Sequence, residues 1–236
     1  MNILDRIRQR AASRPQHIVL PEGNDPRTVV AAAEATSQRI ARITLLGDDE
    51  TIRTIAGDNR LDLGGVAIID HKRAADFDKM VALFHDLRRA KGLMADEART
   101  LVSDPLYYGN LMVRSGLADG SVAGATNTTS HTVRAALHCI GVRPGFKLVS
   151  SFFLMALRNN EFGHDGALIF ADCGVVIEPS SAELAEIALG DHLLFLLVGS
   201  SVALAVGADS GEVDAQLLGG AEELVVLLAH GHLARH

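Results

Sequence analysis

Short apolar runs alternate with amphipathic stretches along most of the chain. Apolar runs bounded by turn residues predict strands at 17–20, 43–47, 66–69, 118–125, 147–155 and 167–171. Helical spacing and capping residues predict helices from Pro26 onward, at 49–56, through much of 74–116, at 129–140 and at 181–188. This alternation predicts an α/β protein with a mostly parallel sheet and helices on both of its faces.

The C-terminal stretch differs from the rest of the chain. Residues 190–236 contain no Lys and no Pro, and their only Arg and only aromatic residue are Arg235 and Phe195. Such a stretch is either a buried segment or the product of a shifted reading frame. With the turn at Gly145, it predicts a first α/β domain at 1–145 and a partial second α/β domain at 146–236, atypical over 190–236.

The composition is that of a globular protein with a modest negative charge. The 236 residues include 22 Lys and Arg against 29 Asp and Glu, which gives a formal net charge of −7. Nucleic acid is not an expected partner, because no block of basic residues exists to displace its condensed counterions. No run of about 18 apolar residues predicts a membrane span. The charged N-terminus lacks the apolar core of a secretory signal, so we expect a cytoplasmic protein that does not bind membranes.

Metal and cofactor fingerprints do not occur in the sequence. Cys139 and Cys173 fit no CxxC spacing, and we interpret both as buried, reduced thiols. The histidines show no metal-ligand pattern, and neither a Walker A loop nor a GxGxxG fingerprint is found. We therefore expect no metal and no cofactor.

The best candidate for binding chemistry is the segment GATNTTSHTVR at 124–134. A predicted strand ends at its small residues, hydroxyl side chains follow, and a helix then begins. Free N–H groups at a helix N-terminus bind anions, and Arg134 lies one turn beyond Ser130 on the same face. The alternative is that Thr128 or Thr129 simply caps the helix and Arg134 is solvated.

Three further places carry polar residues at the ends of predicted elements. Arg88 belongs to the basic cluster LRRAKG, which either complements a helix dipole or clamps a nucleotide phosphate. Glu22, Asp25 and Arg27 lie in the turn after the first strand and are either ligands in a crevice or capping groups. Asp172 ends an apolar strand and is either a carboxylate that faces a cleft or a structural hydrogen-bonding group.

Five segments of the chain together resemble the phosphate acetyltransferase family. They are LPEGNDPR at 20–27, LRRAKG at 87–92, SDPLYYGNLMVRSGLADGSVAGATNTTSHTVR at 103–134, GFKLVSSFFLM at 145–155 and FADCGVVIEPSSAELAEIA at 170–188. The resemblance covers residues 16–189. It implies exchange between acetyl-CoA plus phosphate and acetyl phosphate plus CoA. It also implies an isocitrate/isopropylmalate dehydrogenase-like, three-layer α/β/α fold of two domains, and a homodimer.

The resemblance also implies roles for residues of this sequence. Arginines at the positions of Arg88 and Arg134 help to bind CoA and phosphate, and the hydroxyl residues Thr128, Thr129 and Ser130 lie in the same cleft. Further possible cleft residues are Glu22, Asp25, Arg27, Asn127 and Asp172. The implied substrates are acetyl-CoA, CoA, phosphate and acetyl phosphate.

The chain departs from the family beyond residue 189. The family's catalytic motif, which resembles NDLSRG, its GP-x-x-QG turn and its STKGSA segment do not occur here. No catalytic residue is therefore assigned, and we expect a chain truncated or frameshifted after about residue 189, with a fold incomplete at its C-terminus. The alternatives are an inactive truncated form, a module that binds acetyl-CoA or acetyl phosphate, and a phosphate butyryltransferase.

Overall fold

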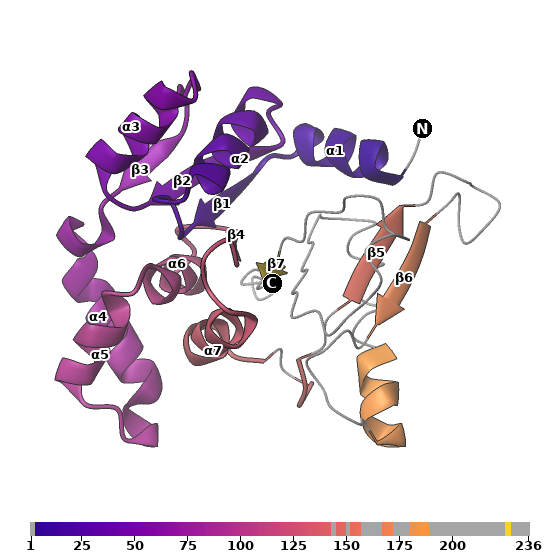
Figure 1. The fold of residues 1–236 in the computed structure, drawn as a ribbon. Helices are drawn as coiled ribbons and strands as arrows, with labels where there is room; N and C mark the ends of the chain where they lie inside the picture. Colours follow the sequence, from indigo (N-terminus) through magenta and orange to yellow (C-terminus); the bar gives the residue numbers. More distant parts are fainter. Residues whose placement is uncertain are drawn as a thin grey trace. The chain divides into compact units, whose positions relative to one another are not determined.

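The computed structural model describes residues 3–142, 145–149, 152–156, 167–171, 180–188 and 225–227 (Figure 1). The chain divides into two compact units, one made of Ala11–Gly141 and Leu227–His236, the other of Met1–Arg10 and Val142–Val226. The domain boundary expected at Gly145 stays a prediction. No helix within the described ranges is long and apolar enough to cross a membrane.

A parallel sheet organises residues 11–141. Its strands are β1 (Gln16–Leu20), β2 (Ala41–Leu46), β3 (Ala67–Ile69) and β4 (Gly120–Ala123). β1 pairs in parallel with both β2 and β4, so that Ile18 lies opposite Ile43 and Gly120, and β2 pairs in parallel with β3. The predicted parallel arrangement is confirmed for these strands, and it brings the carboxyl ends of β1 and β4 to the same edge.

The helices of this unit follow the predicted order. They are α2 (Pro26–Ser37), α3 (Asp49–Asp58), α4 (Phe77–Arg88), α5 (Ala95–Val102), α6 (Pro105–Arg114) and α7 (Thr129–Cys139), with single 3-10 turns η1 (His71–Arg73) and η2 (Arg89–Lys91). Asp25 caps α2 as predicted, because its side chain accepts a hydrogen bond from the Arg27 N–H at 2.9 Å. Asp104 caps α6 in the same way through the Leu106 N–H.

Two hydrophobic clusters cover opposite faces of the sheet. Neighbouring residues of a strand point to opposite faces, and Leu20 and Leu45 join the cluster with α2 and α3, whereas Val19 and Leu46 join the cluster with α4, α5, α6 and α7. Figure 1 shows the same separation, with α2 and α3 on one side of the strands and α4 and α6 on the other. The prediction of helices on both faces is therefore confirmed for this unit.

In the other unit, the described strands form an antiparallel pair. β5 (Phe152–Ala156) and β6 (Ala167–Ala171) run in opposite directions, with Phe152 opposite Ala171. This pair is an exception to the mostly parallel arrangement that the sequence predicts. Antiparallel neighbours need only a short connection, whereas parallel neighbours need a crossover of about a dozen residues or more, and only residues 157–166 separate these two strands.

The strand predicted at 147–155 begins later than expected. The N–H groups of Lys147 and Leu148 donate to the Glu186 carboxylate instead of joining a strand ladder. Glu186 lies on the helix formed by residues 181–188. That helix opens with the predicted capping box, in which the Ser180 N–H and hydroxyl donate to Glu183 Oε2 at 2.8 and 2.7 Å.

The structure describes two further elements. They are helix α1 (Ile3–Ser13) and the short strand β7 (Val225–Leu227).

Candidate functional site

The turn after β1 holds a carboxylate against the loop after β4. Gly23 permits this turn, because a Cβ atom there would lie 2.7 Å from the carbonyl oxygen of Leu46. The turn directs Glu22, whose side chain is 7% exposed, at the loop formed by residues 124–127, here called the β4–α7 loop. The two segments are adjacent in space because β1 and β4 are neighbours in the sheet.

The Glu22 carboxylate binds every backbone N–H of this loop. Its Oε2 accepts from Gly124 and Ala125 at 2.8 and 2.7 Å. Its Oε1 accepts from Thr126 and Asn127 at 2.9 and 2.8 Å, and also from their side chains at 3.1 and 2.8 Å. The loop is thus an anion-binding concavity filled by the protein's own carboxylate.

These bonds decide the ionisation of Glu22. Burial of the side chain opposes ionisation, but hydrogen bonds from Thr126, Asn127, Ala125 and Gly124 outweigh it and hold the pKa of Glu22 below its ordinary value. They also explain why β4 ends at Ala123 rather than at residue 125 as expected, since the N–H groups beyond it serve Glu22. A direct contact of Glu22 with substrate stays a prediction.

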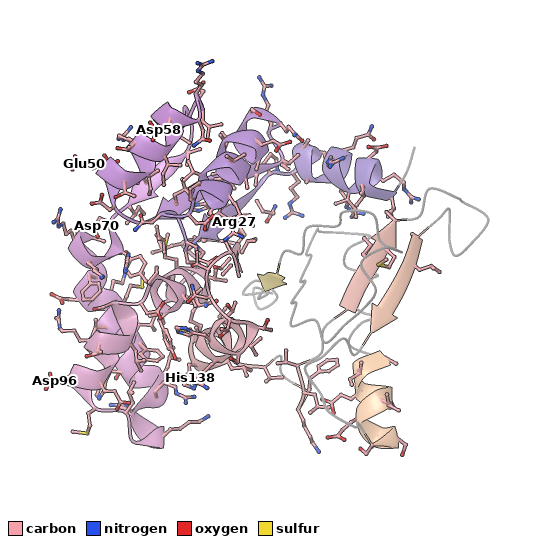
Figure 2. All side chains as sticks on the ribbon, viewed as in Figure 1. Arg27, Glu50, Asp58, Asp70, Asp96 and His138 are labelled. Carbon is pink, nitrogen blue, oxygen red and sulfur yellow. The ribbon has the colours of Figure 1, made fainter. Side chains whose placement is uncertain are left out.

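Asp25 and Arg27 form a second tie to the same loop. The Arg27 guanidinium donates to Asp25 Oδ1 and Oδ2 at 3.0 and 2.9 Å, and it also donates to the carbonyl oxygen of Ala125. The Arg27 side chain, labelled in Figure 2, lowers the pKa of Asp25 mainly through these hydrogen bonds. The capping interpretation of Asp25 is confirmed, and Arg27 connects the start of α2 to the β4–α7 loop.

Helix α7 begins with one of the two capping residues named by the alternative interpretation of this segment. Thr128 is its N-cap: the Thr128 hydroxyl accepts from the His131 N–H at 3.3 Å and lies 3.2 Å from the Ser130 hydroxyl. Within the described part of the chain, the backbone N–H groups of Thr129 and Ser130 have no hydrogen-bond partner. These two groups are the part of the helix start that remains available to an anion.

A side-chain contact that sequence reasoning missed joins the starts of α6 and α7. His131 Nε2 lies 2.9 Å from Asp104 Oδ2, while Asp104 Oδ1 accepts from the Leu106 N–H at 2.8 Å. The same carboxylate therefore caps one helix and contacts the first turn of the next. The sequence holds both residues in the segment at 103–134, but their pairing depends on the packing of α6 against α7.

The two arginines implied by the resemblance lie around one pair of side chains. Arg88 is the last residue of α4 and is half-buried, whereas Arg134 is exposed on α7. Both are close enough to act on Tyr107 and His138. Burial raises the pKa of Tyr107 and the two arginines oppose this rise, whereas burial and then the arginines lower the pKa of His138. Neither arginine side chain has a hydrogen-bond or ion-pair partner among the residues that the structure describes.

His138, labelled in Figure 2, was not assigned by sequence reasoning. Its Nδ1 lies 3.1 Å from the Tyr107 hydroxyl. Burial, and then the charges of Arg88, Arg134 and Lys91, lower the pKa of His138. The available signal was its spacing, because His138 follows Arg134 by four residues and so shares its helix face.

The structure describes only one of the two cysteines, and it does not describe Asp172. Cys139 is a buried free thiol, as expected, and burial raises its pKa. Cys173 and Asp172 lie outside the described residues. In the described ranges, no group of three His, Cys, Asp or Glu side chains could hold a metal ion.

The chain matches a family model described as phosphate acetyl/butaryl transferase over residues 2–198. This match extends beyond the range of 16–189 that the motifs indicated. The phosphate acetyltransferase of Acetivibrio thermocellus is 42% identical over 207 residues, which are 87% of this chain and 62% of the relative. That of Paracoccus denitrificans is 43% identical over 189 residues, or 80% of this chain and 56% of the relative.

Two solved structures resemble the fold. A phosphotransacetylase from Streptococcus pyogenes aligns with a TM-score of 0.76 at 32% identity, covering 91% of this chain and 66% of that one. The EutD phosphotransacetylase from Staphylococcus aureus aligns with a TM-score of 0.72 at 28% identity, covering 83% and 57%. The chain thus spans 56% to 62% of the length of the two curated relatives described above.

Proposed function

The chain belongs to the phosphate acetyl/butaryl transferase family, and on this basis we propose that it transfers an acetyl group between CoA and inorganic phosphate. The substrates are acetyl-CoA and phosphate in one direction, and acetyl phosphate and CoA in the other. A phosphate oxygen attacks the thioester carbon and forms the new carbon–oxygen bond as the carbon–sulfur bond breaks. CoA leaves as the thiolate, which takes up the proton that the phosphate loses. This reaction needs neither a metal nor a cofactor, since CoA is itself a substrate.

The observation that carries this proposal is the pair of arginines at the meeting of α4 and α7. Arg88 and Arg134 lie near the same two side chains, and neither forms an ion pair with a carboxylate of the described residues. Guanidinium groups bind phosphate through two parallel hydrogen bonds. CoA and inorganic phosphate are both phosphate-bearing anions, so two unpaired arginines suit them.

The start of α7 supports the same substrates. The N–H groups of Thr129 and Ser130, which have no partner among the described residues, lie about one turn before Arg134 on the same helix. An anion at this terminus gains from the helix dipole and from the N–H groups. Holding two substrates together in this region would supply rate through orientation, and Glu22 would keep the preceding loop in place for them.

The proposal also covers the detailed fold, the oligomeric state and the cellular location. The chain would adopt the isocitrate/isopropylmalate dehydrogenase-like fold of two α/β domains and act as a homodimer in the cytoplasm, without nucleic acid or membrane partners. The helices on both faces of the sheet in residues 11–141 support this fold. The alignment with the Streptococcus pyogenes structure supports it as well.

Substitution of one arginine tests the binding site. We expect Arg134→Ala to raise the Kd for CoA about tenfold or more, because a charged hydrogen bond is lost. Arg53→Ala is the matched control, since Arg53 is an exposed arginine paired with Asp49 on α3, and it should leave the Kd unchanged. Isothermal titration calorimetry measures both. Equal affinities of Arg134→Ala and the unsubstituted chain for CoA would reject the site.

Turnover tests the activity itself. Formation of acetyl-CoA from acetyl phosphate and CoA is followed by thioester absorbance. A folded chain that binds CoA without turnover would overturn the enzymatic proposal and leave a module that binds acetyl-CoA or acetyl phosphate. Faster turnover of butyryl phosphate than of acetyl phosphate would instead make the chain a phosphate butyryltransferase.

A further inference from the structure

Four basic side chains gather where the end of α4 faces α7. Arg88 ends α4 and Lys91 ends the following turn η2. Arg134 and His138 are four residues apart on α7 and lie on one face of it. We refer to Arg88, Lys91, Arg134 and His138 as the basic cluster, and Figure 2 marks its position by the label of His138.

No carboxylate forms an ion pair with the basic cluster in the described part of the chain, although Asp104, at the start of α6, lies close enough to act electrostatically on Tyr107. Arg88, Lys91 and Arg134 form no ion pair and no side-chain hydrogen bond there. This contrasts with other arginines of the same unit, such as Arg27 and Arg53, which are paired with carboxylates at 2.9 and 2.7 Å. Mutual repulsion among neighbouring cations is unfavourable, so an anion from solution would stabilise this arrangement.

His138 is placed so that it can exist with or without a proton on Nδ1. Its Nδ1 lies 3.1 Å from the Tyr107 hydroxyl, and the two rings meet edge to face with centroids 6.0 Å apart. A tyrosine hydroxyl both donates and accepts. It therefore donates to the neutral imidazole and accepts from the protonated one, and protonation of His138 leaves this contact intact.

The charges that face His138 come from three elements. Arg88 belongs to α4, Lys91 to η2 and Arg134 to α7 itself, and all three are positive, while α6 contributes the neutral Tyr107. Together with burial, the three cations favour the neutral imidazole. An anion bound among them would cancel this field and make the imidazolium stable.

We propose that Lys91 and His138 complete, with Arg88 and Arg134, a site for a phosphate group of the substrates, and that His138 takes up a proton when the site is filled. This inference rests on the proposed function. The family resemblance implies only the two arginines, and the inference adds Lys91, His138 and the uptake of a proton. The filled site binds more protons than the empty one. By linkage, affinity for the phosphate-bearing substrate increases as the pH falls.

Calorimetry tests the proton uptake directly. CoA is titrated into the full chain near neutral pH in two buffers with different ionisation enthalpies, which gives the number of protons taken up. The phosphate monoester of CoA has a pKa of about 6 of its own, so the comparison with a variant isolates the contribution of His138. We expect His138→Gln to lose most of the uptake and to keep its affinity at high pH, because Gln also bonds to a hydroxyl.

The pH dependence of CoA affinity measures how far binding raises the pKa of His138. Each unit by which binding raises the pKa of His138 would tighten CoA binding about tenfold between high and low pH. The affinity of His138→Gln for CoA should not show this tightening at low pH. His85→Gln is the matched control, a histidine of α4 outside the cluster, and should behave as the unsubstituted chain. Lys91→Gln should weaken CoA binding about threefold to tenfold at every pH, through loss of a cation near the phosphate.

Two further probes identify the source of the phosphate group. Proton uptake with CoA that disappears with dephospho-CoA assigns the site to the phosphate monoester of CoA, whereas uptake with inorganic phosphate assigns it to the second substrate. Unchanged proton uptake in His138→Gln overturns the inference even where the chain turns over acetyl phosphate. Uptake that depends on His138 in a chain without turnover supports the inference and refutes the proposed enzyme instead.

Discussion

Replacing Glu22 with Gln tests whether one internal carboxylate holds the β4–α7 loop. Glu22 is 7% exposed, and its two oxygens accept from the N–H groups of all residues from Gly124 to Asn127. Glutamine has nearly the same shape but only one oxygen acceptor. Its amide group would therefore present N–H donors to one pair of the loop's N–H groups, so that donors face donors.

The expected cost follows from the number of bonds lost. Two backbone N–H groups lose a charged acceptor, and hydrogen bonds to charged groups contribute about 1.5–3 kcal/mol each. Gly124 and Thr126 are exposed, so water can replace part of what is lost. We therefore expect Glu22→Gln to lower the free energy of unfolding of this unit by about 2–4 kcal/mol.

The two tyrosines make the assay specific to this unit. The chain has 2 Tyr and no Trp, and Tyr107 and Tyr108 both lie in α6 with side chains 2% and 1% exposed. The near-ultraviolet tyrosine signal during urea unfolding therefore reports on residues 11–141. Glu34→Gln is the control, because Glu34 is exposed on α2 and bonds only to the nearby Gln38 amide in the described chain, and its effect should stay within about 0.5 kcal/mol.

The pH dependence of stability provides a second test of the role of Glu22. The pKa of Glu22 is lowered in the folded chain, so its contribution to stability is fully present above the pKa of the unfolded chain and is lost as the pH falls through the folded value. The difference between the unsubstituted chain and Glu22→Gln should therefore shrink in acid. A stability of Glu22→Gln within about 0.5 kcal/mol of the unsubstituted chain at neutral pH would refute the reasoning.

Three other predictions concern single contacts in residues 11–141. Tyr108→Phe removes the hydrogen bond from the hydroxyl to Asp76 Oδ1 at 2.5 Å and should cost about 1–2 kcal/mol in urea unfolding; no change would mean that the contact is not formed. Thr128→Ala removes the cap of α7 and should cost about 1 kcal/mol, whereas Thr128→Ser should be neutral; equal losses in both would contradict a capping role. In a Cys173→Ser background, Cys139 should react with a thiol reagent only after unfolding, because it is buried and its pKa is raised by burial; labelling of the folded chain would refute this.

The sequence by itself determined the elements and their order. The apolar runs at 17–20 and 43–47 became β1 and β2, and Asp25 followed by Pro26 marked the start of α2. The capping box at Ser180 was equally readable, because caps and apolar spacing depend on residues only a few positions apart. The family was also recognisable, because its motifs keep their residues and their order.

Element ends that depend on distant groups were decided by the tertiary structure. β4 stops at Ala123 because Glu22, about a hundred residues earlier, takes the next N–H groups. β5 begins at Phe152 and not at Lys147, whose N–H donates to Glu186. The local sequence does not reveal that Glu22 and Glu186 bind these N–H groups, because the donors are brought to each carboxylate only by the folding of distant segments.

The candidate site also has parts that the sequence revealed and parts that only the tertiary structure revealed. Sequence reasoning found Arg88, Arg134 and the hydroxyl start of α7, since each belongs to a local motif. It did not find that Glu22 fills the loop amides, that His131 contacts Asp104, or that His138 lies among cations from three elements. Electrostatic and hydrogen-bond partnerships act through space over a few ångströms, so only the packing of α4, α6 and α7 around the sheet decides them.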